Sequence, residues 1–293
     1  MINQPKITVG VPVYNGEKFI QKCLDSVLKQ TRKDFELIIS DNASTDSTPN
    51  ICKDYQKKDN RVKCIFQKSN FGALNNFKEL IENANGEYFL LMAIDNTLSP
   101  TFLEKCAEIL DSSLNVIGCT SKVAIDGQYV DQFKKEKMIL KKIGLEFRAL
   151  NTIPILGSYD DRIKKFLRKW QWETFYSLFR TDVLKKGAVW ETWLGFDGAW
   201  VLNILKYGEI QVVEEFLLHS YPYGESSVGV LQLAKNNNPS TFGKIFPFYP
   251  LTKWCLNNLD RRLFLKNIHH IFRLNIDGIF LQFVSIYQNR KKT

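Results

Sequence analysis

The hydrophobic positions of the first hundred residues follow two alternating periods. Short apolar runs, typical of buried strands, alternate with segments whose apolar residues recur at the three- and four-residue spacing of helices. Strands are predicted over residues 6–13, 35–40, 62–66 and 87–92, and helices over 16–30 and 73–83. A further helix is predicted to begin after the capping residues 44–47 and to end near Lys58. This alternation indicates an α/β fold with a mostly parallel sheet that helices cover on both faces.

The second half of the chain is less regular. Its predicted elements are helices over 102–110 and 199–206, strands over 116–120 and 210–218, a hairpin around 126–127 and ordered structure over 172–179. The charged segment 134–169, with Pro154 and Gly157, is interpreted as a mobile excursion over the site. Beyond residue 229 the chain is predicted to be helical. We therefore expect an α/β domain at residues 1–228 and a C-terminal helical extension at 229–293.

Composition excludes several classes of protein. The 293 residues are 44% hydrophobic and 24% charged, which is ordinary for a globular protein and excludes a wholly disordered chain, a collagen-like repeat and a polytopic membrane protein. The N-terminus lacks the apolar core of a signal peptide, and the six cysteines are widely spaced. We therefore expect free thiols in a reducing compartment, with the cytoplasm as the location.

The chain is basic, with 40 lysines and arginines against 31 acidic residues and a net charge of +9. Such a chain prefers anionic partners, among them nucleotides, nucleic acids and acidic membrane surfaces. Outside the C-terminal tail the basic residues are dispersed, and the sequence has no glycine–aromatic recognition motif. No nucleic-acid partner is therefore expected.

Polar and aromatic residues gather in the loops that follow the first four predicted strands. These loops are residues 12–15, 41–42, 67–72 and 93–96. Ligands of a parallel sheet bind beyond the carboxyl ends of its strands, where such loops meet. The sequence therefore predicts a binding site at this edge of the sheet.

Three aspartates each have a functional and a structural interpretation. Asp41 either accepts hydrogen bonds from a base or ribose or only completes its loop, whereas residues 44–46 are interpreted as helix caps. Asp95 either holds a hard divalent cation that bridges phosphates or closes an Asx turn. Asp197, which lies among aromatic residues, is a general base with a raised pKa, the N-cap of the next helix, or both.

A series of motifs runs along the chain in a recognisable order. They are VPVYNG (11–16), QT (30–31), SDNASTD (40–46), N-x-G-x-x-N (70–75), GEY (86–88), DN-x-LSP (95–100), LFR-x-x-x-L (178–184) and G-x-D (195–197). In this order and spacing, over residues 5–225, they resemble family 2 glycosyltransferases. The resemblance implies the GT-A fold, a Rossmann-like mixed sheet, here with the C-terminal helical extension.

The resemblance further implies a site for a nucleotide-diphosphate sugar, most often a UDP sugar in this family. Pro12 and Tyr14 match positions that hold the nucleotide base, and Asp41 matches the carboxylate that hydrogen-bonds it. Asp95 matches the last acid of the D-x-D motif, which binds Mn²⁺ or Mg²⁺ on the diphosphate, with Asn96 as a neighbouring metal ligand. Further donor contacts are expected at Asn15, Asn70, Gly72, Asn75 and Ile94.

Asp197 matches the family's catalytic base. This base deprotonates the acceptor hydroxyl in a single inverting displacement at the anomeric carbon. The expected acceptor is a glycan or a lipid-linked saccharide.

Two departures from the family pattern bear on catalysis. The first D-x-D acid is Ala93 here, and the acid that often follows the motif is Asn96, so metal affinity is expected to fall. The family's histidine after the last core strand has no counterpart, because His219 comes too early and Tyr223 is nearest the expected place. His219 is interpreted as structural. The alternative function is a degenerate member that binds a nucleotide or glycan without turnover.

The tail has two interpretations of its own. The chain from residue 251 carries a net charge of +6 and an apolar row at near-helical spacing. The row consists of Ile268, Phe272, Ile276, Ile279, Phe283 and Ile286. Either it presses into an anionic membrane at the inner face of the cell membrane, or it packs on the α/β domain or on a second subunit in a homodimer.

Overall fold

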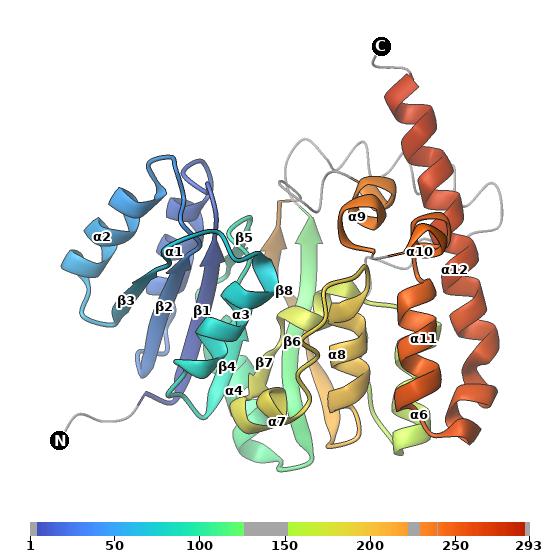
Figure 1. The fold of residues 1–293 in the computed structure, drawn as a ribbon. Coiled ribbons are helices and arrows are strands. Elements are labelled where there is room, and N and C mark those ends of the chain that lie inside the picture. The colour runs from blue at the N-terminus through green and yellow to red at the C-terminus, as the bar shows by residue number, and fades with distance from the viewer. Residues whose placement is uncertain (1–4, 126–151, 222–228, 239, 291–293) are drawn as a thin grey trace.

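The computed structural model describes residues 5–125, 152–221, 229–238 and 240–290 (Figure 1). The predicted hairpin at 126–127 and the position of Tyr223 lie outside these residues. In the described chain the elements follow one another as the sequence predicts, with strands and helices alternating over the first hundred residues.

Eight strands of the described chain form one mixed sheet, in the order β3-β2-β1-β4-β7-β6-β8-β5. Their bounds are β1 Ile7–Val13, β2 Phe35–Asp41, β3 Val62–Phe66, β4 Tyr88–Leu91, β5 Asn96–Leu98, β6 Val116–Ile125, β7 Leu178–Arg180 and β8 Glu209–Ser220. Within this sheet β5 and β7 run antiparallel to their neighbours, and the other pairings are parallel. The parallel strands β1, β2, β3, β4, β6 and β8 therefore end at one edge.

Helices cover both faces of the sheet (Figure 1). One face carries α1 (Ile20–Leu28), α2 (Thr48–Lys58) and α4 (Phe102–Ser112). The other carries α3 (Ala73–Glu82), α6 (Tyr159–Arg168), the 3₁₀ helix η1 (Trp172–Tyr176), α7 (Thr181–Lys186) and α8 (Phe196–Ile204). Outside α8 lie α9 (Gly229–Asn237), α10 (Thr241–Ile245), α11 (Tyr249–Asn258) and α12 (Arg261–Arg290). The α/β prediction is confirmed.

The apolar runs form strands because both faces of the sheet are covered. All seven residues of β2 are buried. Its side chains alternate between the two layers, because Leu37 and Ile39 belong to the core under α1 and α4, while Ile38 belongs to the core under α3. A strand that is buried on both faces needs apolar residues on both, so it appears in the sequence as a continuous apolar run.

The prediction of a mobile excursion at 134–169 is wrong for its described part, residues 152–169. Ile155 forms a β-bridge with Ile210, and helix α6 begins with a reciprocal capping box between Ser158 and Asp161. The buried Arg162 guanidinium donates to the carbonyls of Leu205 (2.9 Å) and Gly157 (2.7 Å). The high charge of this segment suggested an exposed, mobile loop, but Arg162 is buried and donates hydrogen bonds to backbone carbonyls instead of facing solvent.

The C-terminal helices share a hydrophobic core with the α/β layers. Phe248, Leu251 and Trp254 belong to the same buried cluster as Trp200 of α8. The domain boundary near residue 228 stays a prediction, but the helices beyond it pack directly on α8, which carries one of the predicted site residues.

Candidate active site

The loops after β1 and β2 are joined into one unit. Asn15 has a left-handed backbone (φ +50°), and its Oδ1 accepts a hydrogen bond from the Thr45 amide at 2.8 Å. In return the Asn15 amide donates to Ser44 Oγ at 2.8 Å, and the Glu17 amide donates to Asp46 Oδ2 at 3.1 Å. Asn15 therefore fixes the shape of the loop at the end of β1.

The prediction that residues 44–47 cap a helix holds for its last two residues. Helix α2 begins at Thr48 with Ser47 as its N-cap residue, and Asp46 Oδ1 accepts a hydrogen bond from the Thr48 amide at 2.9 Å, although the Ser47 side chain makes no cap hydrogen bond. The hydroxyl of Ser44 is instead an acceptor for the Asn15 amide. Capping residues and loop-bridging residues have the same composition, so the sequence alone does not separate them.

Tyr14 and Asp41 lie at the carboxyl ends of neighbouring strands. Tyr14 follows the last residue of β1 directly, and its side chain is 46% exposed. Asp41 ends β2 opposite Val13, is 2% exposed, and accepts a hydrogen bond from the Ser44 amide at 3.2 Å. Pro12 pairs with Ser40 in the same register. An exposed aromatic ring beside a recessed carboxylate suits a flat, hydrogen-bonding ligand such as a nucleotide base.

A network of side-chain amides organises the loop after β3. Asn42 and Asn76 are each 2% exposed. Asn42 Nδ2 donates to Asn70 Oδ1 at 2.9 Å and its Oδ1 accepts from the Phe71 amide at 3.0 Å, while Asn76 Nδ2 donates to the Ser40 carbonyl at 3.0 Å. Gln67 Nε2 donates to Asn76 Oδ1 at 2.9 Å. Sequence reasoning placed Asn42 and Gln67 in the loops of the predicted site but gave them no role, and it missed Asn76, whose only signal is that it interrupts an apolar helical pattern.

The predicted donor contacts Asn70, Gly72 and Asn75 lie where this loop enters α3. Asn70 Oδ1 also accepts from the Gly72 amide at 2.9 Å, and Asn75 Nδ2 donates to the Phe71 carbonyl at 2.8 Å. Gly72 has a left-handed backbone (φ +85°) that favours glycine. Asn70 therefore shapes the loop at the N-terminus of α3, where unpaired helical amides favour an anion.

A turn after β4 presents Asp95. The Asn96 amide donates to the Ala93 carbonyl at 3.1 Å and closes the turn, and the Tyr221 amide donates to the Asp95 carbonyl at 3.0 Å. The side chain of Ile94 packs on Gly16, because a Cβ built on that glycine would lie 2.8 Å from Ile94 Cδ1. This contact joins the turn to the loop after β1 and brings Asp95 to the same edge as Asp41.

Asn96 and His219 occupy the short β5–β8 ladder. Asn96 is 5% exposed, and within the described residues its Oδ1 has no hydrogen-bond partner. His219 lies opposite Thr97, and its Nε2 is 3.1 Å from Ser99 Oγ. This local hydrogen bond agrees with the structural interpretation of the histidine.

Asp197 lies in the first turn of α8, two residues after the N-cap Gly195. The interpretation of Asp197 itself as the N-cap is therefore wrong. Burial raises the pKa of Asp197 to about 6, although the Gly198 amide donates a hydrogen bond that acts in the opposite direction. Helix α8 leads by a short connection into β8, whose carboxyl end lies at the site edge. The N-terminus of α8, with Asp197, consequently lies at that edge.

Aromatic rings enclose this part of α8. The ring of Phe196 is 6.2 Å from Phe175 and 6.4 Å from Phe77, measured between centroids. Trp170 packs directly on the helix backbone, because a Cβ on Gly198 would lie 2.0 Å from its ring. These rings surround the first turn of α8 and contribute to the burial that raises the pKa of Asp197.

Glu173 is a second partly buried acid at this edge, and sequence reasoning missed it. It lies on η1, just before β7, and the first residue of β7, Leu178, pairs with Leu90 near the carboxyl end of β4. Burial raises the pKa of Glu173 to about 7. A lone acid between Trp172 and Phe175 was the available signal, because acids rarely occur within aromatic clusters unless they are paired or functional.

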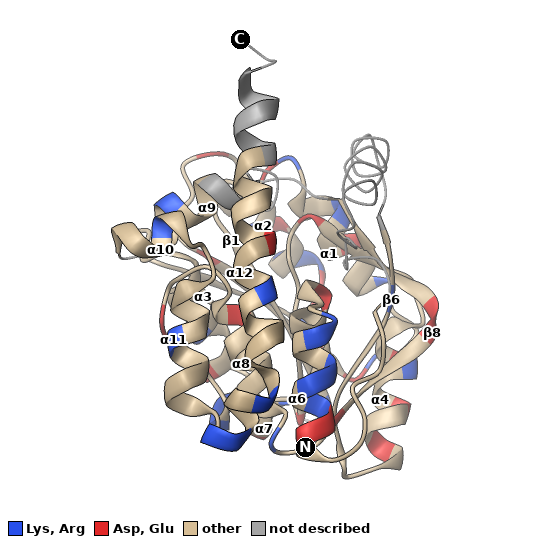
Figure 2. Ribbon diagram, turned by 90° about the vertical axis from the view of Figure 1, so that its right-hand side faces the viewer, with Lys and Arg blue, Asp and Glu red and all other residues tan. Residues whose placement is uncertain are grey.

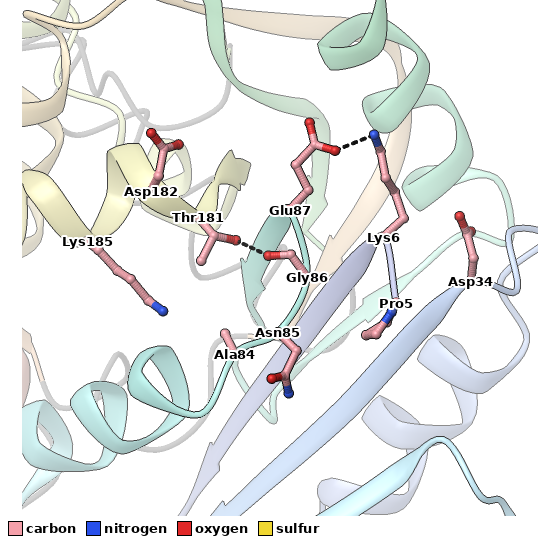
Figure 3. A pocket seen from close by; sticks show the side chains of 10 residues that line it. All are labelled: Pro5, Lys6, Asp34, Ala84, Asn85, Gly86, Glu87, Thr181, Asp182 and Lys185. Carbon is pink, nitrogen blue, oxygen red and sulfur yellow. Dashed lines mark hydrogen bonds and ion pairs between the residues drawn. The ribbon is translucent and has the colours of Figure 1, made fainter. Parts of the chain in front are cut away.

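A pocket with a volume of about 650 Å³ lies at the opposite edge of the sheet (Figure 3). It is lined by residues that precede the parallel strands, among them Lys6, Asp34 and Glu87. Lys6 forms ion pairs with Glu87 (2.5 Å) and Asp111 (3.1 Å). These ion pairs lie at the edge where the parallel strands begin, away from the predicted site.

In the described residues no helix is long and apolar enough to cross a membrane, and no group of three or more His, Cys, Asp and Glu side chains is arranged to hold a metal.

The mixed sheet, with helices on both faces, has the GT-A fold of glycosyltransferases. The chain belongs to the family described as Glycosyl transferase family 2, whose sequence profile matches residues 8–186. The resemblance noted in the sequence is confirmed.

Named relatives match part of the chain. It is 34% identical over 116 residues to the putative glycosyltransferase EpsH of Bacillus subtilis, covering 39% of this chain and 33% of EpsH. It is 36% identical over 104 residues to the glycosyltransferase GlyA of Streptococcus pneumoniae, covering 36% of this chain and 15% of GlyA. The chain thus spans a third or less of the length of these two relatives.

Solved structures share the fold along most of the chain. S. aureus TarS 1–349 in complex with UDP-GlcNAc has a TM-score of 0.58 at 19% identity, covering 94% of this chain and 81% of that one. The mannosyltransferase PcManGT from Pyrobaculum calidifontis, in complex with GDP-Man and Mn²⁺, has a TM-score of 0.59 at 12% identity, covering 100% of this chain and 77% of that one. At these identities the likeness extends to the fold alone.

Proposed function

We propose that this protein transfers a sugar from a nucleotide-diphosphate donor, with a UDP sugar as the first choice, to a hydroxyl of a glycan or lipid-linked saccharide. What supports the proposal is that, in a family 2 chain, Asp41 ends β2, Asp95 follows β4 and Asp197 lies in the first turn of α8. In this proposal Tyr14 stacks on the base, Asp41 hydrogen-bonds it, and the diphosphate lies over the turn at Asp95.

The residues around Asp95 fit a hard divalent cation. The residue after Asp95 in the sequence, Asn96, has a buried amide oxygen, Oδ1, that accepts no hydrogen bond from the described residues. Oxygen donors of this kind suit Mg²⁺ or Mn²⁺, which bind through one or two side chains and complete their coordination with substrate phosphates. A bound cation would neutralise the charge that develops on the departing diphosphate.

Asp197 acts as the base in this proposal. Its carboxylate takes the proton of the acceptor hydroxyl as that oxygen bonds to the anomeric carbon, and the bond to the diphosphate breaks on the opposite face, which inverts the configuration. A pKa of about 6 leaves the group about 90% ionised at pH 7, while making it a stronger base than an ordinary aspartate. The nucleoside diphosphate leaves with the bonding electrons.

A lipid-linked acceptor implies action at the cytoplasmic face of the membrane. The helices at 229–293 belong to this proposal as an extension that holds the α/β domain near such an acceptor. A homodimer through the same helices is the competing arrangement, and vesicle and oligomer measurements separate the two.

The test is a screen of UDP, GDP and dTDP sugars for thermal stabilisation with and without Mn²⁺, followed by assay of nucleotide release with the stabilising donor. Stabilisation by one donor, with release of its nucleotide, supports the proposal. Ala93, which replaces the first D-x-D acid, favours the second candidate, a non-catalytic nucleotide-binding protein. Donor binding without hydrolysis or transfer to any acceptor would favour that candidate.

A further inference from the structure

Helix α12 packs on the protein through one face only. The residues of that face are Leu263, Phe264, Asn267, Ile271, Leu274 and Gln282, each less than 9% exposed. Neighbouring contacts fix the helix in place: Asn275 Nδ2 donates to Thr252 Oγ1 of α11 at 2.8 Å, and Gln282 Nε2 donates to the Lys244 carbonyl of α10 at 2.8 Å. The docking of α12 is therefore complete without the apolar row noted in the sequence.

Four members of that row are exposed, namely Ile268 (47%), Phe272 (66%), Ile276 (44%) and Phe283 (64%), whereas Ile279 is half-buried. Leu265 (55% exposed) precedes them on the same side of the helix. The five exposed residues lie three, four, four and seven residues apart and so form one line along α12, about 27 Å long at 1.5 Å per residue. A continuous apolar line of this length on a surface helix indicates an interaction site.

A basic row runs beside the apolar one. Arg262, Lys266 and Arg273 follow at four- and seven-residue spacing, about 100° further round the helix than the apolar row. Lys266 pairs with Asp160 of α6 at 2.8 Å, and Arg273 lies 3.9 Å from Asp277. The outward face of α12 therefore has an apolar row beside a basic row, in which Lys266 and Arg273 each lie within 4 Å of an aspartate.

The flanking helices extend both halves. Figure 2 shows α6 beside α12 with lysines and arginines along it, and α11 on the other side. Helix α6 exposes Lys164, Lys165 and Arg168. Helix α11 exposes Leu256 (59%). The basic residues of α12 thus continue onto α6, and its apolar residues continue onto α11.

We propose that this α12 surface docks on an anionic lipid membrane, with the helix lying flat in the headgroup region. Helices that lie on membranes combine an apolar face with lysines and arginines that attract anionic headgroups. A second copy of the chain packed antiparallel through this face fits less well, because that arrangement would bring the two basic rows together. Figure 1 shows that α12 runs toward the edge at which the candidate active site lies.

The test is sedimentation of the full chain with vesicles of phosphatidylcholine alone and of phosphatidylcholine mixed with phosphatidylglycerol. We expect binding to the mixed vesicles that weakens as salt is raised. Replacing Phe272 and Phe283 together with serine should weaken it by about tenfold or more. Because both side chains are exposed, the variant should keep its melting temperature. Leu114→Ser, at an 88% exposed leucine between α4 and β6, is the matched control and should bind like the parent.

A charge variant tests the other half of the surface. Arg262→Gln with Arg273→Gln should weaken binding to mixed vesicles by about thirtyfold, from the usual contribution of two basic residues at an anionic surface. Lys57→Gln with Lys58→Gln, on exposed positions of α2, is its control.

Equal binding to both kinds of vesicle, or to neither, would overturn the proposal. So would a dimer in sedimentation equilibrium that the paired serine substitutions at Phe272 and Phe283 convert to monomer while vesicle binding stays unchanged. Sugar transfer plays no part in these measurements, so this inference and the proposed function can fail separately.

Discussion

Replacing Asp197 with asparagine should inactivate the protein and stabilise it at the same time. Burial raises the pKa of this carboxyl from 3.8 to about 6, so the folded state holds the proton more tightly than the unfolded state. The stabilising contribution is then fully present at low pH and is lost as pH rises from about 4 through 6. At pH 7 the buried charge costs about 3 kcal/mol, from 1.36 kcal/mol for each pKa unit.

Asparagine removes that charge with almost no change of shape, and its Oδ1 can still accept the hydrogen bond from the Gly198 amide. The unfolding free energy at pH 7 should rise by up to about 3 kcal/mol, with little change at pH 3.5. Turnover should fall by about 100-fold to 10,000-fold, as expected when a general base is lost. Nucleotide affinity should stay the same.

The assay combines urea denaturation at both pH values, nucleotide release at saturating donor and acceptor, and calorimetric titration of UDP. In the parent protein, turnover should fall about tenfold from pH 7 to pH 5 as the carboxylate is protonated. A variant that loses activity but is also less stable at pH 7 would refute the reasoning, because Asp197 would then be a structural residue. Full activity would refute the role as base.

Three other substitutions test separate parts of the account. Asp95→Ala should abolish Mn²⁺-dependent turnover, measured by nucleotide release across a metal titration, and undiminished activity would contradict the metal role. Burial raises the pKa of Glu173 to about 7, so the parent should lose stability as pH rises from 5 to 8. Glu173→Gln should remove this loss. Identical urea curves for parent and variant at pH 8 would show that the Glu173 charge does not destabilise the fold. Burial disfavours the ionised form of Glu36, but hydrogen bonds from Lys63 (2.7 Å) and Asn85 (2.9 Å) outweigh it and hold the pKa of Glu36 below the ordinary value. Glu36→Gln should therefore cost about 1–3 kcal/mol at pH 7 and much less at pH 3, and an equal loss at both would contradict the charge-based explanation.

Local patterns predicted what depends on local forces. The apolar run of β2 and the three- and four-residue spacing of α1 follow from burial, and both elements form close to their predicted places. The placement of Asp41 and Asp95 at one edge also followed from the sequence, because parallel strands end together and both residues stand at the ends of buried runs.

Contacts between distant segments could not be predicted in the same way. Nothing near Asn42 in the sequence indicates that its side chain hydrogen-bonds to Asn70. Likewise, nothing near Ser44 indicates that its hydroxyl accepts a hydrogen bond from the Asn15 amide instead of one from an amide of α2. The apolar row at Phe272 was visible, but its exposure depends on which face of α12 meets α11, and that is decided by tertiary packing.

The most direct test of the central claim is a crystal structure of the protein with donor and Mn²⁺. The account predicts the base between Tyr14 and Asp41, the diphosphate and cation at Asp95, and the anomeric carbon open to an acceptor on the side of Asp197. A donor bound at the opposite edge, near Lys6 and Glu87, or Asp95 with no contact to cation or phosphate, would contradict it.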